Sequence, residues 1–280
     1  MSERVFVLGA GRAGRGLFRA FRASGVDVVG LHGRRAESVP DPVTAGALPA
    51  DIARADVILV AVRDGQLDEA LAEIGSSRAR PDAVVLHASG SAEPRGLAAL
   101  RARGHPAGTF HPLVPIADPG RAAALFRGAW VGVDGDERAV DVATRLAARL
   151  GARTLRIPNG SKARYHAAAV LASNFPTVLA ALATQLLAGT GIPETEGWAA
   201  IRSLMHGAVA NLDSDAPARA LTGPIVRGDV ATIGRHLAAI PPGELRDVYV
   251  ALARAAVGVA RAAGAADASA LDEIEELLAR

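Results

Sequence analysis

One lysine and one histidine, four positions apart, carry the clearest chemical signal in this chain of 280 residues. Lys162 is the only lysine, because every other basic residue among the 31 lysines and arginines is arginine. Residues four apart share one face of a helix, so Lys162 and His166 would point the same way. A cation or proton donor there would stabilise charge that develops on a reacting oxygen or nitrogen. Lysine suits this because its ammonium can release a proton, whereas arginine keeps its own.

Both residues also have ordinary explanations. Lys162 could be a cation near a helix N-terminus, where the helix dipole slightly disfavours positive charge. His166 could pack in a core or at an interface, and it could equally orient a substrate or act as an alternate acid. We expect Ser89 or Asn174 to supply a hydrogen bond to the same molecule. The catalytic candidates are therefore Lys162, His166, Ser89 and Asn174.

A glycine-rich turn near the N-terminus indicates what these residues would work with. The apolar run Val5–Leu8 is followed by Gly9-Ala-Gly-Arg-Ala-Gly14 and then by apolar residues at helical spacing. In a G-x-G-x-x-G turn the first glycine permits the tight bend, the second lets the backbone approach a pyrophosphate, and the third lets the helix pack closely. Backbone N–H groups at the helix start then face the phosphates. A chance glycine turn is the alternative.

The tip of the second predicted strand favours one cofactor over another. A site that prefers NAD usually places a carboxylate here to bind the ribose 2′-hydroxyl. This chain instead has His32-Gly-Arg-Arg35, with no acidic residue. Guanidinium groups bind a 2′-phosphate through charge-assisted hydrogen bonds, so the tip predicts NADP. Two solvated surface arginines are the simpler alternative.

Short apolar strands alternate with helical segments through the first half of the chain. This alternation predicts an α/β fold, a doubly wound and mostly parallel Rossmann sheet whose strands bind ligands at their carboxyl ends. The expected strands are Val5–Leu8, Val26–Leu31, Asp56–Val62, Ala83–His87, Gly108–Leu113, Ala129–Val133 and Thr154–Ile157. The residues expected to contact the cofactor are Gly9, Ala10, Gly11, Arg12, Ala13, Gly14, Gly33, Arg34, Arg35, Ala61, Val62, Arg63 and His87.

His87 and His111 both lie at predicted strand ends, where a role in the cleft and a role in packing are equally open. The remaining histidines lack metal-ligand spacing, and there is no cysteine, so we predict no metal site and no disulfide.

The second half of the chain shows only helical patterns. We predict an all-helical domain over 159–280, after a cofactor domain over 1–158, with Pro176 kinking or splitting its first helix. Asp229 is a plausible N-cap. The expected helices lie near 161–188, 193–212, 229–239, 243–263 and 268–279.

Charge and hydropathy limit the partners. The net charge is +2 and basic residues are interspersed with acidic ones, so we expect no nucleic-acid binding. Residues 167–193 carry no charge and are numerous enough to span a bilayer. Their alanines, polar residues and Pro176 fit better a helix buried by other helices or by a second subunit. We therefore expect no membrane insertion. The N-terminal residues lead directly into a predicted strand, so we also expect no signal peptide and a cytoplasmic protein.

Several of these motifs together resemble the 6-phosphogluconate dehydrogenase-like superfamily, which includes β-hydroxyacid dehydrogenases, ketopantoate reductases and deazaflavin-linked NADP reductases. The matching motifs are the glycine turn, the Arg34-Arg35 tip and Phe110-His-Pro-Leu113. The full pattern resembles a bacterial family with a Rossmann-like domain and a C-terminal domain of unknown function. It adds the segments 87–90, 162–174 and 221–229.

The resemblance implies a cofactor domain, a helical domain that commonly dimerises, and an active site between them. Several of these enzymes use a Lys-x-x-x-Asn pair on the first helix after the sheet. Lys162 matches that lysine, whereas His166 stands in the asparagine position, which is a departure from the pattern.

These observations predict an NADP-dependent oxidoreductase that forms a homodimer through its helical domain. It would transfer a hydride to a C=O or C=N bond of a small, carboxylate-bearing molecule, with a ketopantoate-type 2-oxo acid as the first candidate. Two alternatives remain. One is a non-catalytic NADP(H)-binding sensor or assembly protein, and the other is an interaction module whose sheet binds a different nucleotide.

Overall fold

The computed structural model describes residues 3–38, 40–93 and 95–280. It consists of two compact units, of which the first ends at Ser173 and the second is Asn174–Arg280. Helix α6 (Lys162–Ala188) runs through this division. The domain boundary expected at residue 158 lies between the last strand and α6, and it stays a prediction.

The first unit is built on one seven-stranded sheet with the order β2-β1-β3-β4-β5-β6-β7. Every neighbouring pair is parallel except β5 and β6, so the prediction of a mostly parallel doubly wound sheet is confirmed. The order reverses at β1, between β2 and β3, and ligands bind at such a switch point. The strands are β1 (Arg4–Leu8), β2 (Asp27–His32), β3 (Val57–Val60), β4 (Val84–His87), β5 (Ala107–Pro112), β6 (Trp130–Gly135) and β7 (Arg153–Arg156).

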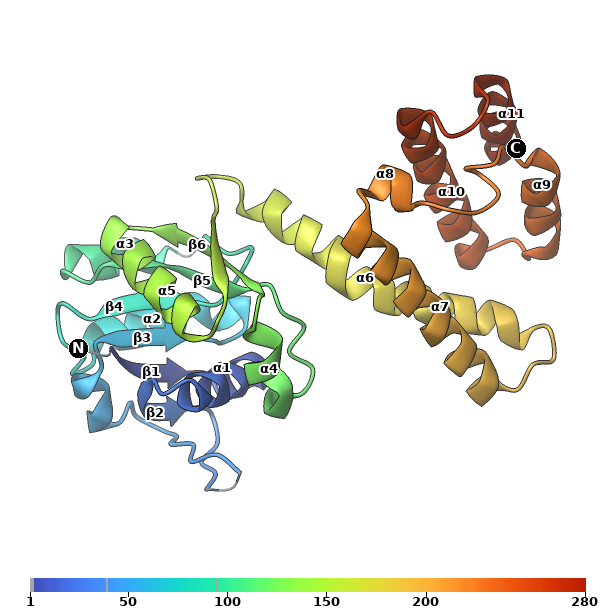
Figure 1. The fold of residues 1–280 in the computed structure, drawn as a ribbon. Coiled ribbons are helices and arrows are strands. Elements are labelled where there is room, and N and C mark those ends of the chain that lie inside the picture. Colours follow the sequence, from blue (N-terminus) through green and yellow to red (C-terminus); the bar gives the residue numbers. More distant parts are fainter. Residues whose placement is uncertain (1–2, 39, 94) are drawn as a thin grey trace. The chain divides into compact units, whose positions relative to one another are not determined.

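Alternating side chains of the strands form two apolar cores, one on each face of the sheet. Val5 and Val7 of β1 pack with α1, α4 and α5, whereas Phe6 and Leu8 pack with α2 and α3. The covering helices are visible around the sheet in Figure 1. They are α1 (Arg12–Ala23), α2 (Leu67–Ser76), α3 (Gly96–Ala102), α4 (Ala122–Phe126) and α5 (Glu137–Arg149), with short 3-10 helices at Ala50–Arg54, Asp64–Gln66 and Pro119–Arg121.

The second unit is helical, as predicted. Asp229 is the N-cap of α9, since its carboxylate accepts a hydrogen bond of 3.0 Å from the Thr232 N–H. Helix α6 continues through Pro176 and is not split there, and α8 has no counterpart among the predicted helices. The remaining elements are α7 (Glu194–Ser214), α8 (Pro217–Ala220), α9 (Val230–Ala239), α10 (Glu244–Ala263) and α11 (Ala268–Ala279).

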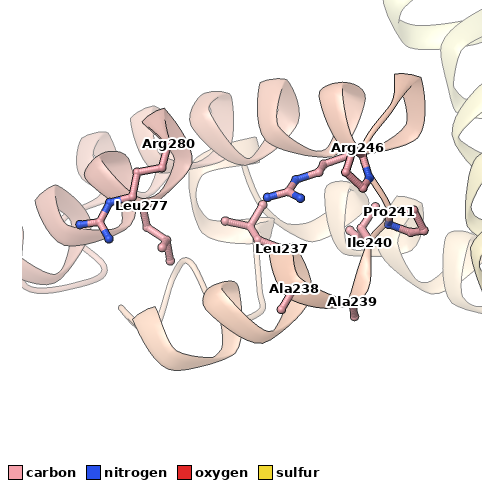
Figure 2. Close-up of a pocket in the computed structure, with 9 residues that line it drawn as sticks. Leu237, Ala238, Ala239, Ile240, Pro241, Arg246, Leu277 and Arg280 are labelled. Atoms are coloured by element: carbon pink, nitrogen blue, oxygen red, sulfur yellow. The ribbon is translucent and has the colours of Figure 1, made fainter.

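Helices α9, α10 and α11 enclose the core of this unit around Ile233, Val257 and Ile274. A surface hollow of about 430 Å³ lies beside them. Figure 2 shows Arg246 reaching over Leu237 in this hollow. None of its lining residues is a predicted site residue.

Helix α6 is long and apolar enough to cross a membrane by length and composition alone. Only 6% of its most apolar window is buried. The expected burial of α6 by other helices or by a second subunit therefore stays a prediction.

Candidate active site

The three glycines of the turn between β1 and α1 have different structural roles. Gly9 has a φ of +116°, which favours glycine, and a Cβ there would collide with the Ala61 carbonyl. A Cβ on Gly14 would collide with the Gly9 carbonyl, so close packing excludes side chains at both positions. Gly11 differs, because a Cβ there would meet nothing within 4 Å. The turn therefore leaves open space at the position where a pyrophosphate would approach the backbone.

The start of α1 is suited to an anion. Gly11 is its N-cap, no side chain caps the helix, and the first turn contains no acidic residue. The backbone N–H groups of Arg12 and Ala13 are among those that a phosphate would meet there.

The tip of β2 lies against this turn. A Cβ on Gly33 would be 2.6 Å from the Cβ of Ala10. Arg34 and Arg35 are exposed, and neither forms an ion pair within the part of the chain that the structure describes. The nearby carboxylate of Glu37 is already 2.6 Å from Arg15. Two available guanidinium groups beside a phosphate-binding turn fit the 2′-phosphate of NADP.

The segment after β3 completes this region. Ala61 packs beneath the glycine turn, where its Cβ is 3.4 Å from the Cβ position of Gly14. Val62 is partly exposed and Arg63 is exposed, so both remain available to a ligand.

A row of polar residues crosses three strands of the sheet, and its first two members, His87 and Thr109, are buried. His87 on β4 is in register with Thr109 on β5, which is in register with Asp134 on β6. The Thr109 hydroxyl and His87 Nε2 are 3.1 Å apart. His87 is 0% exposed, so it could contact a cofactor only if the residues that cover it moved.

Lys162 sits on this row and is buried, with 2% of its surface exposed. Its ammonium is 3.1 Å from the Asp134 carboxylate, donates to the Ala92 carbonyl at 3.1 Å and lies 3.5 Å from His87 Nε2. An ammonium is compact and donates three hydrogen bonds, which matches these three partners. The lysine thus fastens the first turn of α6 to the sheet, and its catalytic role stays a prediction.

A second cluster, formed by His111, Tyr165 and His166, lies nearby. His111 Nδ1 and the Tyr165 hydroxyl are 2.8 Å apart. The rings of His111 and His166 are edge to face, with centroids 5.6 Å apart. His166 Nδ1 is buried without a hydrogen-bond partner among the described residues. Sequence reasoning left His111 undecided and missed Tyr165, although Tyr165 immediately precedes His166.

Two glycines make this cluster possible. A Cβ on Gly90 would lie 2.7 Å from His111 Nε2 and 2.8 Å from His166 Nδ1. A Cβ on Gly132 would collide with the Tyr165 hydroxyl. The three side chains can therefore meet only because positions 90 and 132 carry no side chain.

Burial disfavours the charged forms of His111 and Tyr165 in this cluster. Burial lowers the pKa of His111 to about 4, and the neighbouring His166 ring adds a smaller contribution in the same direction. Burial also lowers the pKa of His87 to about 3, helped by the Lys162 ammonium. The same desolvation raises the pKa of Tyr165 to about 12. At neutral pH, His87 and His111 are therefore neutral imidazoles and Tyr165 is a phenol.

The other two predicted catalytic residues are placed differently. The Ser89 hydroxyl accepts a hydrogen bond of 3.0 Å from the Ala92 N–H. This bond shapes the turn whose carbonyl contacts Lys162. Asn174 is exposed and begins the second unit.

Comparison with known families agrees with this geometry. Residues 4–89 match the family model described as NADP oxidoreductase coenzyme F420-dependent. Residues 129–256 match the model described as a domain of unknown function, DUF2520. The chain thus joins an NADP oxidoreductase domain to a domain of unknown function, as the sequence resemblance implied. Membership of the 6-phosphogluconate dehydrogenase-like superfamily stays a prediction. No curated protein matches the sequence.

Solved structures share the fold over nearly the whole chain. A proposed NADP oxidoreductase from Bacteroides fragilis is 22% identical with a TM-score of 0.73, covering 91% of this chain and 98% of that one. An imine reductase from Myxococcus stipitatus in complex with NADP+ is 20% identical with a TM-score of 0.61, covering 97% and 99%. A Plasmodium falciparum pyrroline carboxylate reductase with NADP bound is 9% identical with a TM-score of 0.59, covering 98% of each chain. At these identities the likeness is one of fold.

Proposed function

We propose that the protein is an NADP-dependent reductase acting on a C=O or C=N bond of a small, carboxylate-bearing molecule. The observation that carries this proposal is the phosphate-binding turn, which is open at Gly11 and flanked by the available guanidinium groups of Arg34 and Arg35. The NADP oxidoreductase model that matches this same segment supports it.

The predicted cofactor residues have distinct roles in this proposal. Backbone N–H groups of Gly11, Arg12 and Ala13 hold the pyrophosphate, and Arg34 and Arg35 hold the 2′-phosphate. When bound, reduced NADP supplies a hydride to the carbon of the double bond.

The chain must then supply a proton to the oxygen or nitrogen that keeps the electron pair of the broken π bond. We assign this proton to His166, through Nε2, because Nδ1 is the buried nitrogen of the ring. Lys162 already has three partners, so its part is to add positive potential and to fix the first turn of α6. Ser89 shapes the turn beside it, and Asn174 remains a candidate hydrogen-bond donor to the substrate.

Two substrate classes are candidates, one from the sequence resemblance and one from the shared folds. A ketopantoate-type 2-oxo acid follows from the sequence resemblance. Cyclic imines follow from the folds shared with an imine reductase and a pyrroline carboxylate reductase. Both classes gain a proton at the atom next to the new C–H bond, which is the step assigned to His166.

A homodimer formed through α6 and α7 is part of this proposal. Phe175, Val178, Trp198, Leu204 and Val209 are all large apolar residues with exposed side chains. A mainly apolar groove of about 710 Å³ lies between the same two helices. Contiguous apolar surface of this kind marks an interaction site, and a second copy would cover it by two-fold symmetry. Covering this surface is consistent with a cytoplasmic protein.

The test is an absorbance screen at the nicotinamide band, using NADPH with 2-oxo acids and cyclic imines. We expect oxidation of NADPH by at least one of these classes. His166→Asn should keep NADPH affinity and lower turnover by about 10²–10⁴-fold, the usual contribution of a general acid. NADPH binding without hydride transfer to any acceptor would favour the non-catalytic sensor. Failure to bind NADPH would favour the interaction module.

A further inference from the structure

We propose that Arg15 is a positioning residue for the NADP preference. It holds the loop after β2 against the glycine turn and keeps the Glu37 carboxylate away from Arg34 and Arg35. This inference rests on the proposed function, because its purpose is to leave those two guanidinium groups free for a 2′-phosphate. Arg15 lies in the first turn of α1, with 15% of its side chain exposed.

The Arg15 guanidinium uses each of its three nitrogens for a different partner. Nε donates to the carbonyl of Ala10, within the glycine turn, at 2.9 Å. Nη2 is 2.6 Å from the Glu37 carboxylate, and Nη1 donates to the Asp41 carboxylate at 3.4 Å. A guanidinium offers five N–H donors in a fixed, planar fork, which suits one group that must hold several acceptors. Arg15 thus joins the turn that would receive the pyrophosphate to the loop after β2.

Asp41 anchors the far side of this loop. It is 4% exposed, and a buried carboxylate is stable only when cations or donors pair with it. Arg19, also on α1, donates through Nε to both Asp41 oxygens at 2.9 and 3.0 Å. Two arginines of α1 therefore hold one buried carboxylate of the loop.

Backbone hydrogen bonds give Glu37 a defined place in the loop, which the structure describes over 33–38 and 40–46. The N–H of Gly33 donates to the Thr44 carbonyl at 2.9 Å. Glu37 and Val43 exchange two hydrogen bonds, of 3.0 and 2.7 Å, in an antiparallel bridge. Glu37 is thereby fixed two residues after Arg35, and it is the acidic residue nearest to the tip along the chain.

The charges of this cluster balance. The two arginines of α1 match the two carboxylates of the loop, so the cluster contributes no net charge beside Arg34 and Arg35. Without Arg15, the half-exposed Glu37 carboxylate would be free to pair with Arg34 or Arg35 and to repel a 2′-phosphate. Arg15 therefore acts on cofactor selectivity without touching the cofactor.

Titration with NADPH and with NADH tests this role. Arg15→Met and Arg15→Gln should each lower NADPH affinity at least about threefold, with a smaller effect on NADH, because only NADPH carries the 2′-phosphate. Arg15→Gln guards against a misfolded Arg15→Met protein, since its amide can still donate to the Ala10 carbonyl. Adding Glu37→Gln to either variant should restore part of the NADPH affinity, because the released carboxylate is gone. An unchanged preference in both single variants, or no recovery in the double variants, would overturn the inference.

The matched control is Arg101→Met. Arg101 likewise binds a carboxylate, that of Asp136 at 2.9 Å, and a backbone carbonyl, that of Ala107 at 3.1 Å. Ala107 begins β5, so these contacts lie at the end of the sheet opposite to the glycine turn. Arg101→Met should leave the ratio of NADPH to NADH affinity unchanged. An equal loss of NADPH preference in Arg101→Met would contradict a specific part for Arg15.

Amide hydrogen exchange tests the positioning without any nucleotide. The N–H groups of Gly33, Glu37, Val43 and Thr44 are hydrogen-bonded within or beside the loop. They should exchange faster in Arg15→Met than in the wild type, because the loop has lost its link to the glycine turn. Exchange at the same rate in both proteins would overturn the positioning role.

These outcomes are separable from failure of the proposed function. A wild-type protein without a preference for NADPH would contradict the proposed function, and amide exchange would then decide on Arg15 alone. A wild-type preference that survives in both Arg15 variants would contradict only the part assigned to Arg15.

Discussion

The ammonium of Lys162 lies 3.1 Å from the carboxylate of Asp134, in surroundings that leave the lysine 2% exposed. The only lysine of the chain is thus the buried half of an ion pair whose carboxylate is partly exposed. This pair joins the first turn of α6 to β6. The compact ammonium donates in three directions, which matches its three partners and gives a local reason for a lysine at this position.

Removing this ammonium should lower the free energy of unfolding. Lys162→Met leaves the Asp134 charge without its partner in a largely buried position, which typically costs about 3–5 kcal/mol. Urea unfolding measures the change. The matched control is Arg219→Met, which breaks an exposed pair with Asp215 and should cost about 0–1 kcal/mol. Equal effects of the two variants would show that the buried pair has no special structural role.

Alanine substitutions at Gly11 and Gly14 of the glycine turn should affect two different properties, NADPH affinity and thermal stability. Gly11→Ala adds a Cβ into open space on extended backbone, so thermal stability should be unchanged while NADPH affinity falls by at least about tenfold, or about 1.4 kcal/mol. Gly14→Ala adds a Cβ that collides with the Gly9 carbonyl, so the unfolding temperature itself should fall. Calorimetry and NADPH titration measure the two effects. Full NADPH affinity in Gly11→Ala would place the phosphates elsewhere.

The fold could be predicted from the sequence because its signals are local. Apolar runs and glycine turns define the strands, and helical spacing marks α7, α9, α10 and α11 to within about two residues of their observed ends. Helix α8 was missed because four residues, Pro217–Ala220, carry no periodic pattern. The antiparallel pairing of β6 also gave no sequence signal, since it depends on the path of the chain between Pro112 and Trp130.

The site was less predictable because its contacts are long-range. Spacing placed Lys162 and His166 on one helix, but it could not show that Asp134 neutralises the lysine. The His111–Tyr165 contact joins residues 54 positions apart. It also depends on Gly90 and Gly132 having no side chains, which becomes apparent only when β4, β5, β6 and α6 are assembled.

His87, which is buried, and His111, which is partly buried, should make the folded protein less stable in acid. Their folded pKa values of about 3 for His87 and about 4 for His111 lie below the ordinary value of 6.5. Below pH 6.5 these histidines bind protons in the unfolded chain but not in the folded protein. The free energy of unfolding therefore has its full value above pH 6.5 and decreases as the pH falls toward 4. Each histidine contributes a slope of up to about 1.4 kcal/mol per pH unit.

Urea unfolding between pH 4.5 and 7.5 measures this slope. His87→Asn should flatten the profile by the contribution of one histidine. A profile as steep in His87→Asn as in the wild type would mean that His87 is not held neutral by burial.

The apolar surface of α6 and α7 should hold two copies together. Leu204 and Val209 are 71% and 61% exposed, so Leu204→Glu combined with Val209→Glu should give a monomer, because two buried charges oppose association. Sedimentation velocity measures the mass. The control is Leu252→Glu, on an exposed position of α10, which should leave the dimer intact. A wild-type protein that sediments as a monomer would contradict the dimer.

The most direct measurement is a paired titration of the protein with NADPH and NADH, followed by the fluorescence of the reduced nicotinamide. NADPH should bind at least about tenfold more tightly, a difference of about 1.4 kcal/mol. Arg34→Ala combined with Arg35→Ala should remove this difference by weakening NADPH alone. Equal affinity for the two nucleotides, or a preference that survives loss of both arginines, would contradict the assignment of this tip to the 2′-phosphate of NADP.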